Sequence, residues 1–252
     1  MPTHLYKNWC DVKVTDISVA RKLHSFTEKN GIRSKIHATI VETVHSHYED
    51  PKRLSDRIKR LGLTKASTVL DKMLPKSKKA RSGHLGEIFA AEVVPAVFPS
   101  FKVPIKRLRW LDGREMALRG EDVIGFSREK NRVRFLKGES KSGASITPTV
   151  VAEARAALKS NKGRPSQHAM GFVKQRLLDQ GDDETALIFE WFMLQKTIPV
   201  EDIVHMMFAF SGNDASNQLE SDLRAYGGKI EQHAVNLRIN DHQKFISSIY
   251  RK

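Results

Sequence analysis

The sequence contains one cysteine, Cys10, and no long apolar run. A single cysteine excludes a disulfide framework and a cysteine-based zinc site, and it fits a reducing compartment. No stretch approaches the ~18 uninterrupted apolar residues of a membrane span, and residues 1–11 lack the apolar centre of a signal peptide. We therefore expect a soluble, cytoplasmic protein with no membrane partner.

Common nucleotide and zinc motifs are also missing. Without a GxxxxGKS/T loop, this chain is not expected to bind a nucleotide cofactor, so any ATP hydrolysis belongs to a partner. Ten histidines are present, but none lies in an HExxH motif, and His45 and His47 point in opposing directions on a helix or on a strand followed by a turn. A histidine metal site is therefore not expected.

Basic residues are abundant: 43 Lys and Arg stand against 29 Asp and Glu, which gives 252 residues a formal net charge of +14. The excess indicates a polyanionic partner, nucleic acid first and an anionic membrane surface second, and charge alone does not choose between them. Residues 51–81 hold eleven basic and two acidic residues, and residues 102–119 hold six and two. Residues 182–202 hold six acids and one lysine, so the chain is electrostatically polarised.

Apolar spacing predicts an α/β fold with a mixed central β-sheet flanked by helices. Residues 16–74 predict mostly helix, with apolar positions at helical spacing in 36–44 and 54–61. Residues 76–83 predict a basic linker, and residues 84–94 predict a helix that stops at Pro95. The boundary there divides a mostly helical N-terminal region, residues 1–82, which docks a partner or shapes DNA access, from a second domain, residues 83–252.

The second domain is expected to begin with strands and continue with alternating helices and strands. Strands are predicted over 103–110, up to Leu118, over 122–126 and over 133–139. Thr147 followed by Pro148 predicts the start of a helix through residue 159, and Ser166 precedes another. A helix over 185–196, a strand over 204–210, a helix over 216–226, a strand over 235–239 and a closing helix follow.

Three acidic residues and one lysine can be brought together by this sheet. If residues 128–131 form the turn between two strands, Asp122 pairs with Lys137, and Asp122, Glu139 and Lys141 share one face. The Asp122 to Glu139 diagonal is then roughly 7–8 Å. Glu87 reaches in from the preceding helix. A turn one residue longer or shorter would move Asp122 to the other face.

This set suits phosphodiester hydrolysis. Asp122 and Glu139 can hold Mg²⁺, with Mn²⁺ as a substitute, because Mg²⁺ prefers oxygen ligands and keeps several waters. Lys141 can orient the attacking water or neutralise developing phosphate charge, and Glu87 can complete the metal shell. An ordinary salt bridge at a strand end is the alternative explanation for the Glu139-x-Lys141 triplet.

The ordered set of Glu87, Asp122 and Glu139-x-Lys141 resembles the PD-(D/E)xK nuclease superfamily, whose restriction-endonuclease-like core is a mixed sheet flanked by helices. The segments GHLGEIFAAEVV, RLRWLDGREMALRGEDVIGF and FLKGESKSG, with VAEARAAL and GRPS, are similar to the HamA-like nuclease subunits of the Hachiman anti-phage defence system. This resemblance covers about residues 84–172. It implies a Mg²⁺-dependent deoxyribonuclease that works beside a superfamily 2 helicase subunit of the HamB type. Glu121 stands where the superfamily pattern has Pro, and it is expected to face away from the site.

Several basic residues are candidates for contacts with DNA phosphates. They precede the helix that bears Glu87, flank the first predicted strand of the second domain, or follow the helix after the Glu139-x-Lys141 strand: Lys76, Lys78, Lys79, Arg81, Lys106, Arg107, Arg109 and Arg164. Solvated charge, or docking of an acidic partner, is the alternative. Two other functions stay open, a non-catalytic basic DNA-binding or regulatory subunit and a site-specific restriction-type endonuclease.

Overall fold

A computed structural model describes residues 4–62, 67–116, 120–130, 132–195 and 198–251. In this part of the chain, one mixed six-stranded sheet has the order β1-β2-β6-β5-β4-β3. β2, β6, β5 and β4 run parallel, while β1 and β3 are antiparallel to their neighbours at the two edges. The strands are β1 (Cys10–Ser18), β2 (Arg21–Glu28), β3 (Val123–Glu129), β4 (Arg132–Gly143), β5 (Ile203–Ser211) and β6 (Glu231–Arg238).

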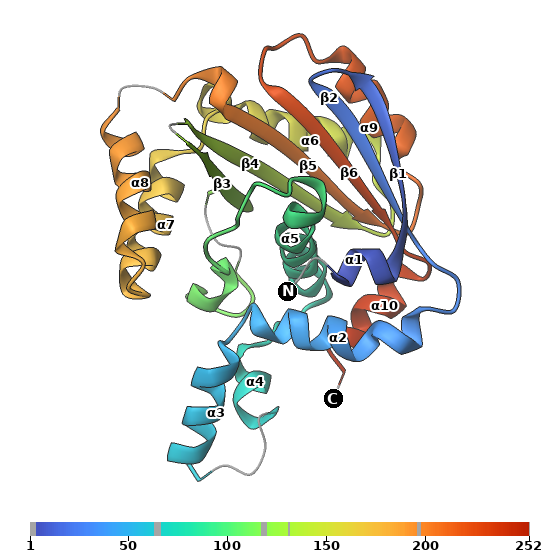
Figure 1. The fold of residues 1–252 in the computed structure, drawn as a ribbon. Coiled ribbons are helices and arrows are strands. Elements are labelled where there is room, and N and C mark those ends of the chain that lie inside the picture. The colour runs from blue at the N-terminus through green and yellow to red at the C-terminus, as the bar shows by residue number, and fades with distance from the viewer. Residues whose placement is uncertain (1–3, 63–66, 117–119, 131, 196–197, 252) are drawn as a thin grey trace.

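Helices cover both faces of this sheet (Figure 1). One face packs against α5 (Lys78–Val97), together with α1 (His4–Trp9), α2 (Arg33–Ser46) and α10 (His242–Ile249). The other face packs against α6 (Pro148–Lys159) and α9 (Ser216–Ala225), and near β3 and β4 against α7 (Gln167–Asp179) and α8 (Asp183–Leu194). Because the centre of the sheet is covered on both sides, β5 is nearly continuously apolar, and every one of its residues is buried.

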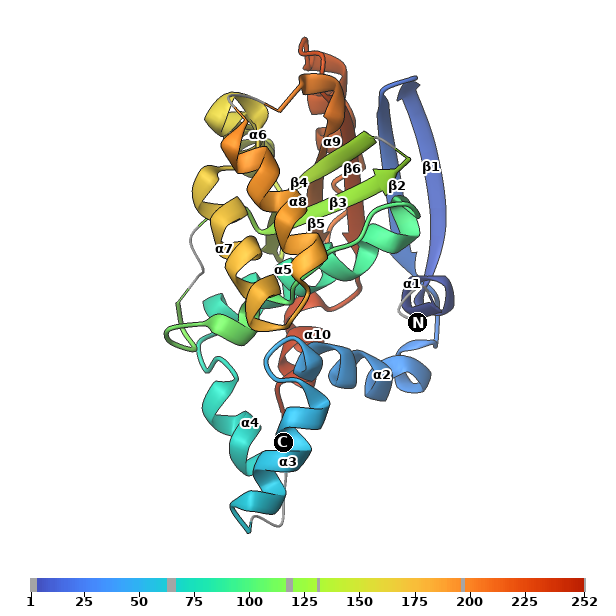
Figure 2. The ribbon, with the colours of Figure 1, turned by 60° about the vertical axis from the view of Figure 1, so that its left-hand side comes forward.

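Two short helices lie apart from these layers. α3 (Pro51–Arg60) and α4 (Ser67–Met73) extend away from the sheet beyond α2 in both views (Figures 1 and 2). The short 3₁₀ segments are η1 (Arg107–Trp110), η2 (Ser160–Gly163) and η3 (Val200–Asp202). η1 connects the α5 side of the molecule to β3, and η2 follows α6.

The prediction of an α/β fold with a mixed, helix-flanked sheet is confirmed. The expected helix starts are confirmed by side-chain caps: Thr147 accepts a hydrogen bond from the Val150 N–H and Ser166 accepts one from the Ala169 N–H. The later helices and strands also occur in the predicted order, as α8, β5, α9, β6 and α10. Their boundaries differ from the predicted ones by a few residues.

The N-terminal region is helical only in part. α2 and α3 confirm the predicted helices, but the predicted helical stretch from residue 16 is wrong at its start, where the end of β1 and all of β2 lie. β2 pairs in parallel with β6, more than 200 residues away, and this distant pairing decides its conformation. The spacing of apolar residues within a segment does not show which distant strand that segment will pair with. A role for residues 1–82 in partner docking or DNA access stays a prediction.

The predicted linker and the predicted end of the next helix are both wrong. α5 begins at Lys78, where the Ser77 side chain accepts a hydrogen bond from the Ala80 N–H, so most of residues 76–83 are helical. The helix also continues past Pro95 to Val97. Pro95 removes one hydrogen bond close to the helix end, and the fully buried Val93 and Val94 offset that loss.

The strand predicted over residues 103–110 is also wrong. Only Lys102 forms an isolated bridge, to Phe126, and residues 107–110 form η1. Pro104 has no N–H to donate to a ladder, which is why the pairing does not extend. Leu118, the expected end of the next strand, lies outside the described residues.

Candidate active site

The β3–β4 hairpin has a register two residues away from the predicted one. Glu129 pairs with Arg132 and Val123 pairs with Gly138, whereas the predicted turn placed Ser127 opposite Arg132. A shift of two residues preserves which side chains share a face, because side chains alternate along a strand. The next position along each strand is Asp122 on one side and Glu139 on the other, so these carboxylates are opposite one another instead of diagonal.

Hydrogen bonding fixes Asp122 at this end of the hairpin. Asp122 Oδ2 accepts a hydrogen bond of 2.8 Å from the N–H of Ser140, the residue that follows Glu139. Lys141 Nζ lies 2.9 Å from Glu139 Oε1. The side chains of Glu139 and Lys141 are partly exposed, at 15% and 28%. The hairpin therefore brings Asp122, Glu139 and Lys141 together at one partly open edge.

Glu87 reaches the same site because α5 approaches β4 closely at Gly86. A Cβ atom at position 86 would lie 2.8 Å from Ser140 Oγ and 3.0 Å from Ser142 Cβ, so glycine is the residue that allows this approach. Glu87 and Asp122 line one pocket, whose other walls are largely apolar and include Ile88 and Ile124. The sequence signal for this close approach is the Gly86-Glu87 pair.

Burial and mutual repulsion make these carboxylates weak acids. Burial, then the nearby charge of Asp122, raises the pKa of Glu87 to about 8. Burial, then the nearby charge of Glu139, raises the pKa of Asp122 to about 7, although the Ser140 N–H and Arg107 act in the opposite direction. Perturbed carboxyl groups in a shared pocket are typical of functional sites.

Arg107 is the basic side chain that faces this pocket. It is buried on η1, and its Nη1 atom lies 4.0 Å from Glu87 Oε2. Its charge lowers the pKa values of both Glu87 and Asp122, but not enough to return them to ordinary values. Sequence reasoning assigned Arg107 to DNA phosphates and missed its position beside Glu87.

The carboxylates suit an open metal site better than a closed cage. Among the described residues, no group of three or more His, Cys, Asp and Glu side chains is arranged to hold an ion by itself. Mg²⁺ does not need such a cage, because it binds one or two carboxylates and keeps waters or substrate oxygens as its other ligands. Glu87 Oε2 is buried without a hydrogen-bond partner among the described residues, and Asp122 is desolvated. These are the properties that a bound cation would relieve.

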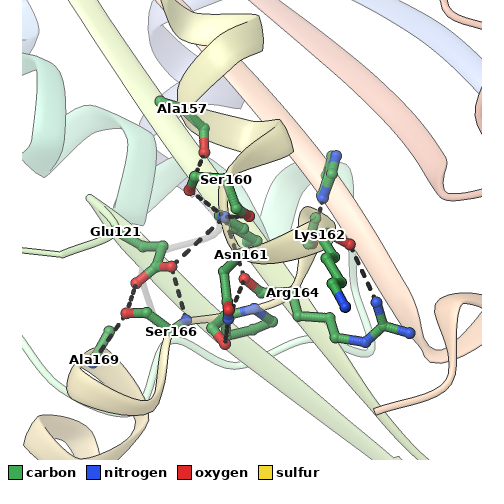
Figure 3. A network of polar contacts seen from close by, with 12 residues as sticks. Glu121, Ala157, Ser160, Asn161, Lys162, Arg164, Ser166 and Ala169 are labelled. Atoms are coloured by element: carbon green, nitrogen blue, oxygen red, sulfur yellow. Dashed lines mark hydrogen bonds and ion pairs between the residues drawn. The ribbon is translucent and has the colours of Figure 1, made fainter. Parts of the chain in front are cut away.

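Glu121 makes its contacts away from this cluster, as expected. Its carboxylate accepts hydrogen bonds of 2.8 Å from the Ser166 N–H and hydroxyl at the start of α7 (Figure 3). The buried Lys137 lies 3.6 Å from Glu121 and donates hydrogen bonds to the carbonyl oxygens of Ser160 and Arg164. This network ties β4, α7 and the residue before Asp122 to one another.

The candidate DNA-binding residues fall into two groups. Lys76, Lys78 and Lys79 are exposed at the start of α5. The other five side chains contact the protein itself: Arg81 contacts the Pro75 carbonyl, Lys106 contacts Ser46 and Glu92, Arg107 contacts Glu87, Arg109 contacts Ser46 and Asp50, and Arg164 contacts the Ile198 carbonyl. DNA binding by either group stays a prediction.

The aromatic segment in α8 is divided between core and surface. Phe189 is fully buried and packs against Phe126 of β3 and Phe135 of β4 in the core, while Trp191 is 55% exposed. Within the described residues, no helix combines the length and apolar character needed to cross a bilayer.

Fold and site together define an α/β protein with a mixed sheet and a carboxylate–lysine cluster at the end of an edge hairpin. The sequence matches the HamA family over residues 3–252, and the chain belongs to that family. It is similar to the Hachiman protein HamA of Bacillus cereus, with 26% identity over 179 residues. The alignment covers 71% of this chain and 62% of that relative, so the chain spans less than two thirds of the relative's length. The resemblance to the Hachiman family seen in the sequence is therefore confirmed.

Proposed function

We propose that this protein is a metal-dependent DNA nuclease with a PD-(D/E)xK core, and that it serves as the effector subunit of a Hachiman anti-phage defence complex in the cytoplasm. The observation that carries the proposal is the convergence of Glu87, Asp122 and Glu139 with Lys141 at one end of the hairpin. Membership of the HamA family supports the defence role. A superfamily 2 helicase is the proposed partner.

In this proposal, Asp122 and Glu139 hold Mg²⁺, and Glu87 supports it directly or through water. Mg²⁺ bound by these carboxylates would supply Lewis acidity and help to activate the attacking water. Glu139 keeps Lys141 beside the scissile phosphate, where the ammonium group orients the attacking water and neutralises charge that develops on the phosphate oxygens. The Ser140 N–H holds Asp122 in position before any ligand binds.

The test is cleavage of DNA by purified protein, alone and with the helicase partner, in Mg²⁺ or Mn²⁺ and in EDTA. Cleavage should require the metal, and Glu139→Ala or Lys141→Ala should reduce it at least ~100-fold, the scale expected for removal of a group that stabilises the transition state. Glu153→Gln changes an exposed carboxylate on α6 and is the matched control. Unchanged cutting by folded Glu139→Ala and Lys141→Ala proteins would refute the assignment.

A second candidate is a non-catalytic DNA-binding or regulatory subunit built on the same fold. The 2.9 Å contact between Lys141 and Glu139 favours it, because an ion pair of this kind can serve structure alone. Metal-independent retention of DNA without cleavage, even with the helicase present, would support this candidate. Discrete fragments in place of a smear would instead indicate a site-specific endonuclease.

A further inference from the structure

α3 is an unusual helix because none of its residues is buried. It projects away from the sheet together with α4 in both views (Figures 1 and 2). A surface helix of a globular protein normally buries an apolar stripe, which supplies most of its stabilisation. Here the packing contribution is small, so the side chains that α3 presents to solvent are its distinctive feature.

The solvent-facing side of α3 is strongly basic. Four cationic side chains are exposed and form no ion pair with any described residue: Lys52, Arg53, Lys59 and Arg60. A fifth, Arg57, is paired with Glu49 at 2.5 Å. At 3.6 residues per turn, the four unpaired cations fall on the side of the helix opposite Leu54 and Ile58, which are half-buried.

The base of α3 is attached to the segment that lines the carboxylate pocket. Asp50 caps α3 by accepting hydrogen bonds from the Lys52 and Arg53 N–H groups, and its carboxylate lies 3.3 Å from Arg109. Arg109 also donates to the Ser46 carbonyl at the end of α2. Arg109 belongs to η1, the same four-residue segment that places Arg107 beside Glu87. The start of α3 is therefore held against η1, the segment that lines the candidate active site.

We propose that α3 is a DNA-binding arm whose Lys52, Arg53, Lys59 and Arg60 contact phosphates of the DNA that enters the active site. As a substrate-binding surface, it rests on the proposed nuclease function. Unpaired cations in a row attract a phosphate backbone and release its counterions. A bilayer fits less well, because Leu54 and Ile58 are half-buried and α3 has no aromatic residue. Among the described residues beside α3, Leu61 alone is an exposed apolar side chain.

The experiment compares two proteins of equal net charge. The arm variant changes Lys52, Arg53, Lys59 and Arg60 to Gln. The control variant changes four exposed lysines outside α3 to Gln: Lys7, Lys13, Lys159 and Lys229. Binding of a fluorescent DNA duplex is measured by anisotropy across a salt series, with EDTA present so that no cutting occurs. Circular dichroism checks that both variants fold, and vesicles with anionic lipid are tested in parallel.

The arm variant should bind DNA at least ~10-fold more weakly than the control variant. The slope of its plot of log Kobs against log salt concentration should be shallower by about 3 to 4, because each lost phosphate contact reduces the magnitude of that slope by about 0.9. Equal affinities and slopes for the two variants would overturn the proposal, as would absence of DNA binding by the unmodified protein. Loss of vesicle binding without loss of DNA binding would also overturn it. Because these measurements need no cleavage, a protein that binds through α3 but never cuts would refute only the nuclease function.

Discussion

In the metal-free protein, the burial of Glu87 and Asp122 beside one another lowers the stability of the fold when both carboxyl groups are ionised. Both carboxyl groups are buried beside one another, and their pKa values are raised to about 8 and about 7. A carboxyl whose pKa is higher in the folded than in the unfolded protein stabilises the fold at low pH and loses that contribution as the pH rises through its folded-state pKa. The site is thus destabilised at alkaline pH until a cation binds.

Replacement of Glu87 by the neutral, similarly shaped Gln should therefore stabilise the metal-free protein. In EDTA at pH 9, Glu87→Gln should raise the Tm by about 2–4 °C for each ~1 kcal/mol of repulsion relieved. At pH 4.5 the difference should largely disappear, because Glu87 is then protonated in the folded protein. Thermal unfolding at both pH values is the measurement. Glu153→Gln, on the exposed face of α6, should change neither Tm, and a lower Tm for Glu87→Gln at pH 9 would contradict the interpretation.

At the scale of elements, the distance between α5 and β4 decides whether Glu87 can face Asp122. Gly86 is the contact point, and an added Cβ would meet Ser140 Oγ at 2.8 Å. Overpacking of this kind costs about 1–3 kcal/mol, against a gain of ~1 kcal/mol when Gly is replaced by Ala inside a helix. The clash is expected to dominate.

Gly86→Ala should therefore lower the free energy of unfolding and also reduce DNA cleavage by moving Glu87. Gly83→Ala is a matched control on the same helix, because nothing lies within 4 Å of its Cβ position. It should stabilise the protein by ~0.5–1 kcal/mol through helix propensity. Denaturant unfolding and a cleavage assay measure the two effects. Equal stability changes for both variants would show that the close approach is not maintained in solution.

At the scale of the whole molecule, buried histidines from separate elements make the fold sensitive to acid. Burial lowers the pKa values of His24 on β2, His205 on β5 and His242 on α10 to about 4. These groups are neutral in the folded protein but take up protons when unfolded below pH ~6.5. Stability should therefore fall as the pH drops from ~6.5 towards 4, because the unfolded state then binds more protons.

His205→Gln should weaken this pH dependence. His205 Nε2 lies 2.7 Å from the Gly163 carbonyl oxygen and accepts at Nδ1 from Gln232, so the neutral ring is the form that fits. Each buried histidine contributes at most about 1.4 kcal/mol per pH unit across that range. Urea unfolding between pH 4 and pH 7 measures the slope. His168→Gln, at an exposed position of α7, should leave it unchanged. The interpretation fails if His205→Gln retains the full slope.

The sequence by itself determined the features that depend on local chemistry. Local sequence patterns predicted the strands over 122–126, 133–139, 204–210 and 235–239, which correspond to β3, β4, β5 and β6. Thr147 and Ser166 predicted helix starts, and side-chain alternation placed Glu139 and Lys141 on one face. The resemblance to the Hachiman nuclease subunits then identified the family. The helix starts and the side-chain alternation depend on residues that are close together in the sequence, so they can be predicted from it.

Only the tertiary structure decided what depends on distant partners. β2 is a strand because it pairs with β6. Arg107 lies beside the pocket on η1, a 3₁₀ segment where the sequence had predicted a strand. The hairpin register also differed from the predicted one, by two residues. Because side chains alternate along a strand, an even shift leaves Asp122 on the same face as Glu139 and Lys141. Pairing and close packing join residues far apart in sequence, and their free energies outweigh local preferences.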